Sequence, residues 1–557
     1  MELTTEQQQI IGSTGNIKIN AVAGSGKTST LIEYARTRPY GSKILYLAFN
    51  KSVKTDAVKK FAAHGLTRVS VETAHSLAYK RIVFKHGYSI KTQGYKTNDI
   101  VDILKLQSVG GKYSEFILAN HISKLMSRFC NSDKRRVQEV SYLDEHTDPN
   151  VIKFVSTHYD VIVNQTRSLL GKMDKGQDAS MAMLDVFKKQ QAVKVIVGDT
   201  HQQIYGWRYA VNSLEIMDFR PFQLTSSFRF GQDIANLACQ ILALKRYVNY
   251  ERGVKITGLG RKSSVITHAV IARTNLGLLL KVIDNVIVKQ NAKHIYFEGN
   301  IQSYTYTEDG ASLYDVLNLF KRRKHMIKDK LIRSMYDIGD LEYYIEMSGD
   351  VELGMMVELV KKYEDELPNI IKKIKEYHIG LEDKERADVV FSTVHRCKGM
   401  EYDSIELAND FINEEKLKRL ENEKELTAID EAKVVEEINL LYVAVTRACC
   451  KIAIPESLVP EKSTPSKNIT LLKTETKISR LTENVELKIS SKPTPELQKQ
   501  TDLDRNGYKP WTSELDRALR IMHCNGVSVE ALASHFARTK GAIRSRIKKL
   551  GLDSAEI

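Results

Sequence analysis

Short apolar runs alternate with longer amphipathic stretches along the first 80 residues of the chain. Residues 17–19 and 43–50 are runs typical of buried strands, and residues 51–63 follow the second run with a helical spacing of apolar positions. A third short run covers residues 69–71. Strands that alternate with helices are typical of a parallel sheet with crossover helices, so the pattern predicts an α/β fold.

The pattern changes in later parts of the chain. Residues 79–154 are helical and basic, which predicts an inserted helical subdomain before the strand pattern resumes at residues 193–197. Residues 455–508 are rich in Lys, Ser, Thr and Pro without a helical period, which predicts a tether. Helix-start signals near Trp511, Val527 and Arg538 then predict a three-helix module in residues 509–557.

A glycine-containing segment after the first strand run carries the clearest chemistry. Gly24 and Gly26 allow the backbone to curl so that successive N–H groups point at an anion, and a helix that begins near Lys27 adds its positive end. Lys27 would reach the β- and γ-phosphates of a nucleotide, and the Thr28 hydroxyl would hold Mg²⁺. Ala21 occupies the position of the usual first glycine. The alternative is a plain glycine turn between a strand and a helix.

Composition narrows the function classes. The 557 residues exceed what one core can organise, so about three to five domains or subdomains are expected. The net charge of +14 favours a polyanionic partner, and nucleic acid is the first candidate. The six cysteines contain no Cys-x-x-Cys pair, which fits reduced thiols in a cytoplasm. The beginning of the sequence has no signal pattern, so neither secretion nor membrane insertion is predicted.

Five further segments follow the glycine loop in a fixed order. Together with the loop they resemble the motifs of UvrD-like superfamily 1 DNA helicases over about residues 3–454, and His201-Gln202-Gln203 is similar to the F-box helicase branch of that family. The segments are Gly198–Arg208 (GDTHQQIYGWR), Leu224–Phe230 (LTSSFRF), Ile271–Asn275 (IARTN), Thr393–Tyr402 (TVHRCKGMEY) and Glu437–Ala448 (EINLLYVAVTRA).

The resemblance implies two RecA-like P-loop domains with helical insertions, with ATP in the cleft between them and single-stranded DNA across both. Residues 1–78 and 155–220 would form the first motor domain, and residues 79–154 its insertion. Residues 221–300 and 385–454 would form the second motor domain, and residues 301–384 its insertion. Residues 455–508 would then be a linker to the C-terminal module.

The resemblance also implies roles around ATP. Lys27 and Thr28 would hold phosphate and Mg²⁺, Gln202 would sense the γ-phosphate, and Arg229 and Arg447 would come from the second domain. The loop contacts would be made by Ala21, Ala23, Gly24, Ser25, Gly26 and Ser29. Base and ribose contacts would come from Gln7, Phe228 and Glu401. From the residues alone, Gln7 could pair with an adenine edge, although a solvated helix is the plainer interpretation of residues 3–11.

One position departs from the family. At the spacing of motif II the chain has Asp174-Lys175-Gly176-Gln177-Asp178, so a lysine stands where the family has its catalytic glutamate. Asp174 is still expected to hold Mg²⁺ through water. A charged lysine cannot take a proton from water unless it is strongly desolvated, and loss of a general base costs about 10²- to 10⁴-fold in rate. Two interpretations stay open: an active motor, and a hydrolysis-impaired, nucleotide-gated DNA-binding protein.

The expected DNA contacts fall into two groups. The motor track would use aromatic faces that stack on bases at about 1–3 kcal/mol each, together with polar neighbours: Phe49, Asn50, Thr73, His75, Tyr205, Trp207, Arg208 and His395. The last helix signal resembles a Myb/SANT-like helix-turn-helix with basic residues suited to phosphate: Arg538, Lys540, Arg544, Arg546 and Lys548. We expect single-stranded and forked DNA as partners, duplex contact through the module, and a nucleoid-associated place in a bacterial or phage-type cytoplasm. A docking module for proteins is the alternative for residues 509–557, and a helix-turn-helix regulator with an ATPase switch is the third interpretation of the chain.

Overall fold

The structure is a computed structural model of the 557-residue chain. It describes residues 3–48, 51–73, 76–77, 79, 84, 95–132, 134–143, 146, 148–172, 191–206, 212–248, 250, 253–260, 267–305, 312–422, 428–461 and 466–473 and, further on, residues 519, 522–523, 528–536, 538 and 540–550. The chain divides into two compact units, Met1–Ile489 and Ser490–Ile557.

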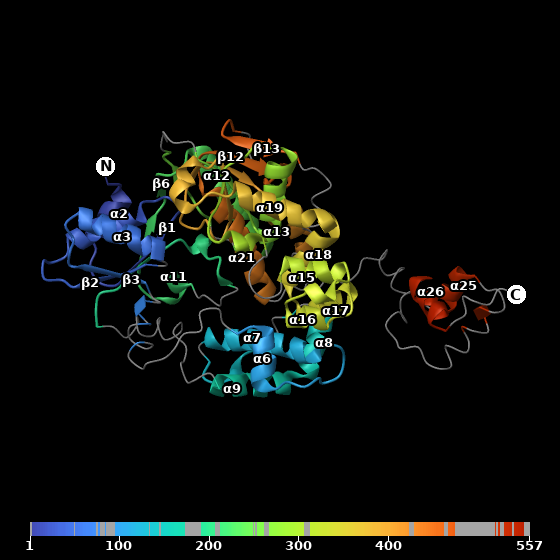
Figure 1. The fold of residues 1–557 in the computed structure, drawn as a ribbon. Coiled ribbons are helices and arrows are strands. Elements are labelled where there is room, and N and C mark those ends of the chain that lie inside the picture. Colours follow the sequence, from blue (N-terminus) through green and yellow to red (C-terminus); the bar gives the residue numbers. More distant parts are fainter. Residues whose placement is uncertain are drawn as a thin grey trace. The chain divides into compact units, whose positions relative to one another are not determined.

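The first part of unit 1 is built on short parallel strands. β1 (Ile17–Ala21) lies between β4 (Val195–Gly198) and β5 (Arg220–Leu224). β2 (Ile44–Ala48) and β3 (Val69–Thr73) form a second parallel pair, which within the described residues makes no backbone ladder to the other three strands. The helices here are α1 (Thr5–Ile11), α2 (Lys27–Arg36), α3 (Lys51–Ala63) and the short α11 (Ser213–Ile216) (Figure 1).

The second part contains a six-stranded parallel sheet in the order β13-β12-β11-β8-β10-β9. The strands are β8 (His268–Ala272), β9 (Ile295–Phe297), β10 (Val389–Thr393), β11 (Tyr402–Leu407), β12 (Ala448–Pro455) and β13 (Ile469–Leu472). The helices α12 (Gln232–Ala243), α13 (Asn275–Ile283), α20 (Glu414–Asn422) and α21 (Ala428–Val445) accompany this sheet, and β6 (Ser226–Ser227) pairs with β7 (Thr257–Gly258). Strands such as Val389–Thr393 are buried along their whole length, because helices cover a parallel sheet on both faces.

Helices make up the two insertions. The first holds α6 (Thr97–Leu104), α7 (Ser114–Cys130), α8 (Pro149–Thr157) and α9 (Tyr159–Lys172), and α9 packs on α6 and α7 (Figure 1). The second holds α14 (Ile301–Thr305), α15 (Leu313–Phe320), α16 (Lys330–Ser334), α17 (Ile338–Ser348), α18 (Val351–Tyr363) and α19 (Leu367–Tyr377). α17 contacts both α7 and α8, so the two insertions share a packed interface.

The α/β class with parallel sheets and helical insertions is confirmed, whereas two details differ from the sequence prediction. The first helical cluster extends to Lys172 rather than to residue 154, because Ile162, Val163 and Leu169 form an apolar stripe that is buried at helical spacing. The predicted tether at residues 455–508 contains β13, which pairs with β12 as an edge strand. The second sheet therefore continues past residue 454.

Unit 2 is described in its last two helices, α25 (Val529–Phe536) and α26 (Lys540–Lys549). Leu519, Leu532, Phe536, Ile543 and Ile547 form its buried core. Among the described residues of the whole chain, no helix is both long enough and apolar enough to cross a bilayer.

Candidate active site

The loop between β1 and α2 has the backbone conformation that the glycines were expected to provide. Gly24 and Gly26 have φ values of +72° and +74°, in the left-handed region that favours glycine. Gly26 is the N-cap of α2, so the unpaired amides at the start of this helix point into the loop. Ser25 is buried, and its hydroxyl finds no hydrogen-bond partner among the described residues. The loop is therefore a concave set of donors that suits an anion.

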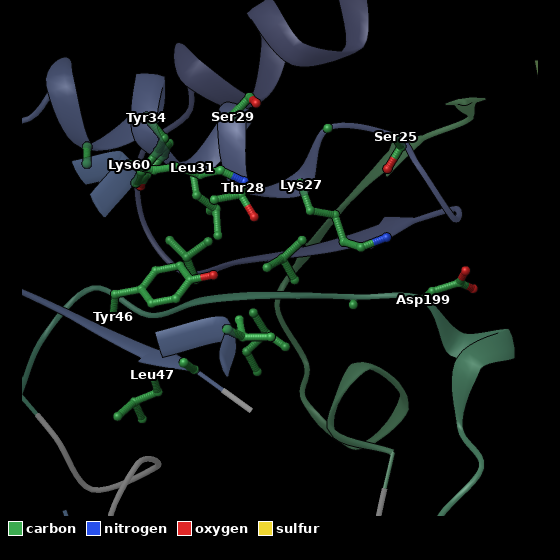
Figure 2. A pocket seen from close by; sticks show the side chains of 18 of the residues that line it. Ser25, Lys27, Thr28, Ser29, Leu31, Tyr34, Tyr46, Leu47, Lys60 and Asp199 are labelled. Atoms are coloured by element: carbon green, nitrogen blue, oxygen red, sulfur yellow. The ribbon is translucent and has the colours of Figure 1, made fainter. Parts of the chain in front are cut away.

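Lys27 begins α2 and lies across the mouth of this loop. Its ammonium group donates to the carbonyl oxygens of Ala21 and Val22, both at 2.8 Å. Figure 2 shows Ser25, Lys27 and Thr28 around the loop, with Lys27 extending toward the side of the pocket where Asp199 lies. Burial lowers the pKa of Lys27 to about 8, Asp199 opposes this shift, and the neighbouring positive charges of Arg229, Arg447 and Lys398 add to it.

The loop opens into a large cleft with a volume of about 1870 Å³. Residues from both sheets line it, including Gly24–Ser29 and Asp199 from the first part and Arg229, Lys398 and Arg447 from later in the chain. Burial and the charge of Arg447 lower the pKa of Lys398 to about 8. Burial and the charge of Arg229 lower the pKa of Arg447 to about 10. Cations that destabilise one another in this way favour a bound polyanion.

Arg229 lies directly against the phosphate loop at Gly24. A Cβ at Gly24 would lie 2.6 Å from the Arg229 Cβ and 2.7 Å from the Ser227 hydroxyl, so the two segments touch where Gly24 has no side chain. The Phe228 amide also donates to the Gly24 carbonyl at 2.9 Å. The Arg229 guanidinium donates to Glu401 at 3.0 Å and to the Thr446 carbonyl at 2.8 Å. The structure therefore brings together Arg229, Glu401 and the loop.

Arg447 lines the cleft but is held by the protein itself. It is 1% exposed, and its guanidinium donates to the carbonyls of Val443 and Met400 and to the Thr446 hydroxyl. These contacts fix the end of α21 against the turn before β11. Because the carbonyls take part of its donor set, Arg447 also has a structural role at this corner of the site.

Gln7 and Phe228 lie beside the loop. The Gln7 side chain completes a capping box with Thr4 at the start of α1, and its amide nitrogen donates to the Thr30 hydroxyl at 3.1 Å. A Cβ at Gly26 would lie 3.3 Å from the Gln7 amide and 3.8 Å from the Phe228 ring. Gln7 is therefore buried against α2 rather than placed on a solvated helix face.

The segment after β4 carries several expected residues. Asp199 caps the short 3-10 helix Thr200–Gln202, and its carboxylate accepts from the His201 amide at 3.0 Å and the Gln202 side chain at 2.9 Å. Further on, the Tyr205 hydroxyl donates to the His395 carbonyl at 3.2 Å, and a His395 ring nitrogen lies 3.1 Å from the Ile204 carbonyl. The predicted phosphate sensor and two predicted track residues thus belong to one connected stretch.

The structure describes some of the remaining predicted residues but not others. Thr73 is buried, and its hydroxyl is bonded to Ser76 rather than open at a surface. In unit 2, Arg538 is buried, Lys540 and Arg544 are exposed, and Arg546 is half-buried. Phe49, Asn50, His75, Asp174, Trp207 and Arg208, together with the Lys548 side chain, lie outside the described residues, as does Lys175.

The residues present fit a nucleoside triphosphate. The loop provides inward donors, an unpartnered buried hydroxyl and a lysine, and the cleft adds further cations. For a divalent metal, Thr28 lies at the first turn of α2 beside the loop. In the described part of the chain, no cluster of three or more His, Cys, Asp or Glu side chains is placed to hold a metal ion. The predicted partner of Thr28, Asp174, is outside that part.

Sequence reasoning gave no role to two residues that bond to the segment after β4. Lys398 donates to the Gln202 carbonyl at 2.8 Å, and the Tyr442 hydroxyl donates to Asp199 at 2.9 Å. Both residues lie inside segments that resemble helicase motifs. Their hydrogen-bond partners, however, are distant in sequence, so the motifs alone did not indicate these bonds. The Tyr442 hydroxyl in the apolar run of residues 440–445 was the one available signal.

The fold and the site define a P-loop protein in which a parallel-sheet domain presents the phosphate loop to a second parallel-sheet domain. The chain belongs to the family described as UvrD-like helicase C-terminal domain, whose model matches residues 68–455. The matched range begins just before β3 and ends at the last residue of β12.

Three relatives are similar to between 41% and 82% of the chain. F-box DNA helicase protein 1 of Schizosaccharomyces pombe is 27% identical over 535 residues, which covers 82% of this chain and 58% of the relative. F-box DNA helicase 1 of Gallus gallus is 27% identical over 527 residues, with 82% and 49% covered. Gabija protein GajB of Bacillus cereus is 27% identical over 260 residues, with 41% and 47% covered. The chain thus spans about half the length of the curated relatives it matches.

Proposed function

We propose that this chain is an ATP-dependent DNA helicase and translocase that moves 3′ to 5′ along single-stranded DNA. The observation that carries the proposal is that Arg229 lies against the phosphate loop at Gly24 while its guanidinium is bonded to Glu401 and to the Thr446 carbonyl, which belong to the second part. An arginine supplied across a cleft can accelerate phosphoryl transfer by about 10³- to 10⁵-fold. Hydrolysis would then depend on the relative position of the two sheets, so that each ATP turnover drives a domain movement.

In this proposal the residues of the site divide the work. Lys27 and the loop amides hold the β- and γ-phosphates, and Thr28 together with Asp174 holds Mg²⁺, which would screen phosphate charge. Gln202 senses the γ-phosphate, Arg229 stabilises charge that develops during transfer, and the backbone-bound Arg447 keeps positive potential at the cleft. The family and the names of the helicase relatives support DNA as the track.

The second candidate is a hydrolysis-impaired protein that closes on ATP and DNA without turning over. Lys175, at the motif II glutamate position, favours it, because an ammonium group cannot accept a proton from the attacking water. The two candidates agree on ATP and DNA binding and differ in turnover. They are therefore separated by kinetics rather than by affinity.

ATP turnover with and without single-stranded DNA, on the natural chain and on Lys175→Glu, tests the proposal. Turnover of the natural chain that DNA stimulates, with little gain in the variant, supports the helicase and means that another group supplies the base. Turnover in Lys175→Glu alone supports the impaired protein. Lys175→Gln is a matched control, because it removes the charge without adding a base.

For unit 2 we propose duplex contact by the exposed face of α26, where Lys540 and Arg544 are exposed. Charge contacts of this kind hold DNA without reading its sequence, and the affinity would fall steeply with salt. A forked DNA would then engage the motor on its single strand and unit 2 on its duplex. We place such a protein at the nucleoid of a bacterial or phage-infected cell.

A further inference from the structure

A row of hydrogen bonds joins α21 to the segment that follows β4. The Tyr442 hydroxyl donates to the Asp199 carboxylate at 2.9 Å, and the Asn439 amide donates to the Gln203 carbonyl at 2.9 Å. The Gly206 amide donates to the carboxylate of Glu436 at 3.0 Å. Successive members on α21 are three residues apart, so that each neighbouring pair shares a helix face. The helix and the segment run in opposite senses.

The row is protected from water at the end near the phosphate loop. Tyr442 is fully buried and Asn439 is 3% exposed. The Tyr442 ring also packs edge-on against the His201 ring, with centroids 6.1 Å apart. At the other end, a Cβ at Gly206 would collide with the Glu436 carboxylate, so the missing side chain allows that bond to form. Hydrogen bonds that are shielded in this way constrain geometry more strongly than exposed ones.

The segment held by this row connects the two predicted functions. Near its start, Asp199 also accepts from Gln202, and the Ala23 amide of the phosphate loop lies 3.5 Å from the Tyr442 hydroxyl oxygen. Near its end, Tyr205 donates to the His395 carbonyl, on the predicted DNA track. A change at the phosphate loop is therefore linked to the track by one continuous set of contacts.

The helix itself leads to the cleft. α21 ends at Val445, and the next residue, Thr446, offers its carbonyl to Arg229, which touches the loop at Gly24. A movement of α21 would therefore shift the carbonyl to which Arg229 is bonded, and it would strain the three bonds to residues 199–206 unless that segment moved as well. Because α21 packs with the second sheet whereas β4 belongs to the first, the row crosses between the two motor domains.

We propose that Glu436, Asn439 and Tyr442 form a coupling row that transmits nucleotide binding to the DNA track, with Tyr442 as its positioning residue. This inference rests on the proposed function and adds a route between its two sites. Tyr442 touches Asp199 and the loop backbone, so it acts through Gln202 rather than on ATP. Loss of its hydroxyl should weaken the linkage between the sites and leave each site able to bind its own ligand.

The test compares Tyr442→Phe with Tyr142→Phe. Tyr142 is an equally buried tyrosine in the first insertion, and its hydroxyl lies 2.9 Å from the Nδ1 atom of His121. For each protein, the affinity for a single-stranded oligonucleotide is measured with and without a non-hydrolysable ATP analogue, and the affinity for the analogue is measured alone. A bond from a hydroxyl to a carboxylate is worth about tenfold or more in an equilibrium constant.

The proposal expects that the analogue changes DNA affinity in the natural chain and in Tyr142→Phe. This change should be lost in Tyr442→Phe, while the affinity for the analogue stays within about threefold. An unchanged shift in Tyr442→Phe overturns the coupling row but leaves the proposed function standing. If the natural chain itself shows neither a shift nor DNA-stimulated turnover, the proposed function fails, and the coupling falls with it.

Gly206→Ala is a second variant that tests the same proposal at the other end of the row. The added methyl group should displace Glu436 and break the far end of the row without touching the phosphate loop. The same loss of linkage is expected in a folded protein, as judged by its thermal unfolding. If the analogue changes DNA affinity in Gly206→Ala and in Tyr442→Phe as much as in the natural chain, the proposal is contradicted at both ends of the row.

Discussion

Replacement of Gly24 by alanine tests how closely the cleft must close. Gly24 has φ +72°, and an added Cβ would lie 2.6 Å from the Arg229 Cβ and 3.2 Å from the Arg229 amide nitrogen. Atoms so close to the backbone cannot rotate away as the tip of a side chain can. The positive φ costs about 1 kcal/mol in an L-residue, and overpacking adds about 1–3 kcal/mol. If the clash raises the free energy of the closed state by about 2 kcal/mol relative to the open state, the population of the closed state falls about 30-fold.

Gly15→Ala is the matched control. Gly15 has φ +77°, and no described atom lies within 4 Å of its added Cβ, so this variant bears the strain without the clash. We expect Gly15→Ala to lose about 1 kcal/mol of unfolding free energy from strain alone, and Gly24→Ala to lose about 2–4 kcal/mol because the clash adds to the strain. Gly24→Ala alone should also lose at least about 30-fold in ATP turnover. Denaturant unfolding and steady-state turnover measure the two effects. Near-normal turnover in Gly24→Ala would refute the close contact between Gly24 and Arg229 in the working state.

Three further predictions follow from the site. Between pH 7 and pH 9, ATP affinity should fall by up to about tenfold per lysine, because Lys27 and Lys398, with pKa values near 8, lose the charge that holds phosphate. Isothermal titration measures this affinity, and an affinity that does not change with pH would contradict the prediction. Arg229→Lys should lower the rate of single-turnover hydrolysis by about 10³-fold or more while ATP affinity changes little, since a lysine cannot bond to both Glu401 and the Thr446 carbonyl. A normal rate of hydrolysis would show that Arg229 takes no part in the reaction. Gln7→Leu should cost about 1 kcal/mol through the lost cap and reduce the preference for ATP over GTP, and an unchanged preference in competition assays would leave Gln7 only as a cap.

The phosphate loop could be predicted from sequence because its determinants are local. Two glycines at positive φ, a strand before them and a lysine at the first helical residue lie within eleven residues, Ile17–Lys27. The α/β class follows from the same kind of local pattern. By contrast, Tyr442 and Asp199 are 243 positions apart, and no local pattern links a tyrosine in an apolar helix to a carboxylate after β4.

The boundaries were harder to predict for a related reason. Residues of α9 have the helical stripe that a close count reveals, but the family's motif II led to a first-domain assignment for residues 155–172. β13 is four residues long and exposed at Thr470 and Leu471, so its sequence resembles a linker until β12 is beside it. Arg447 shows the same limit: the sequence marks it as a cleft arginine, while its bonds to the Val443 and Met400 carbonyls appear only in the fold.

Displacement of streptavidin from biotinylated single strands tests the central claim most directly. The protein is mixed with ATP and an oligonucleotide that carries biotin at the 5′ end or at the 3′ end, and release of streptavidin is followed over time. A motor that moves 3′ to 5′ should displace streptavidin from the 5′ end in an ATP-dependent manner and leave the 3′ end bound. No displacement from either end, despite normal binding of ATP and DNA, would contradict the motor and favour a protein that grips DNA without moving.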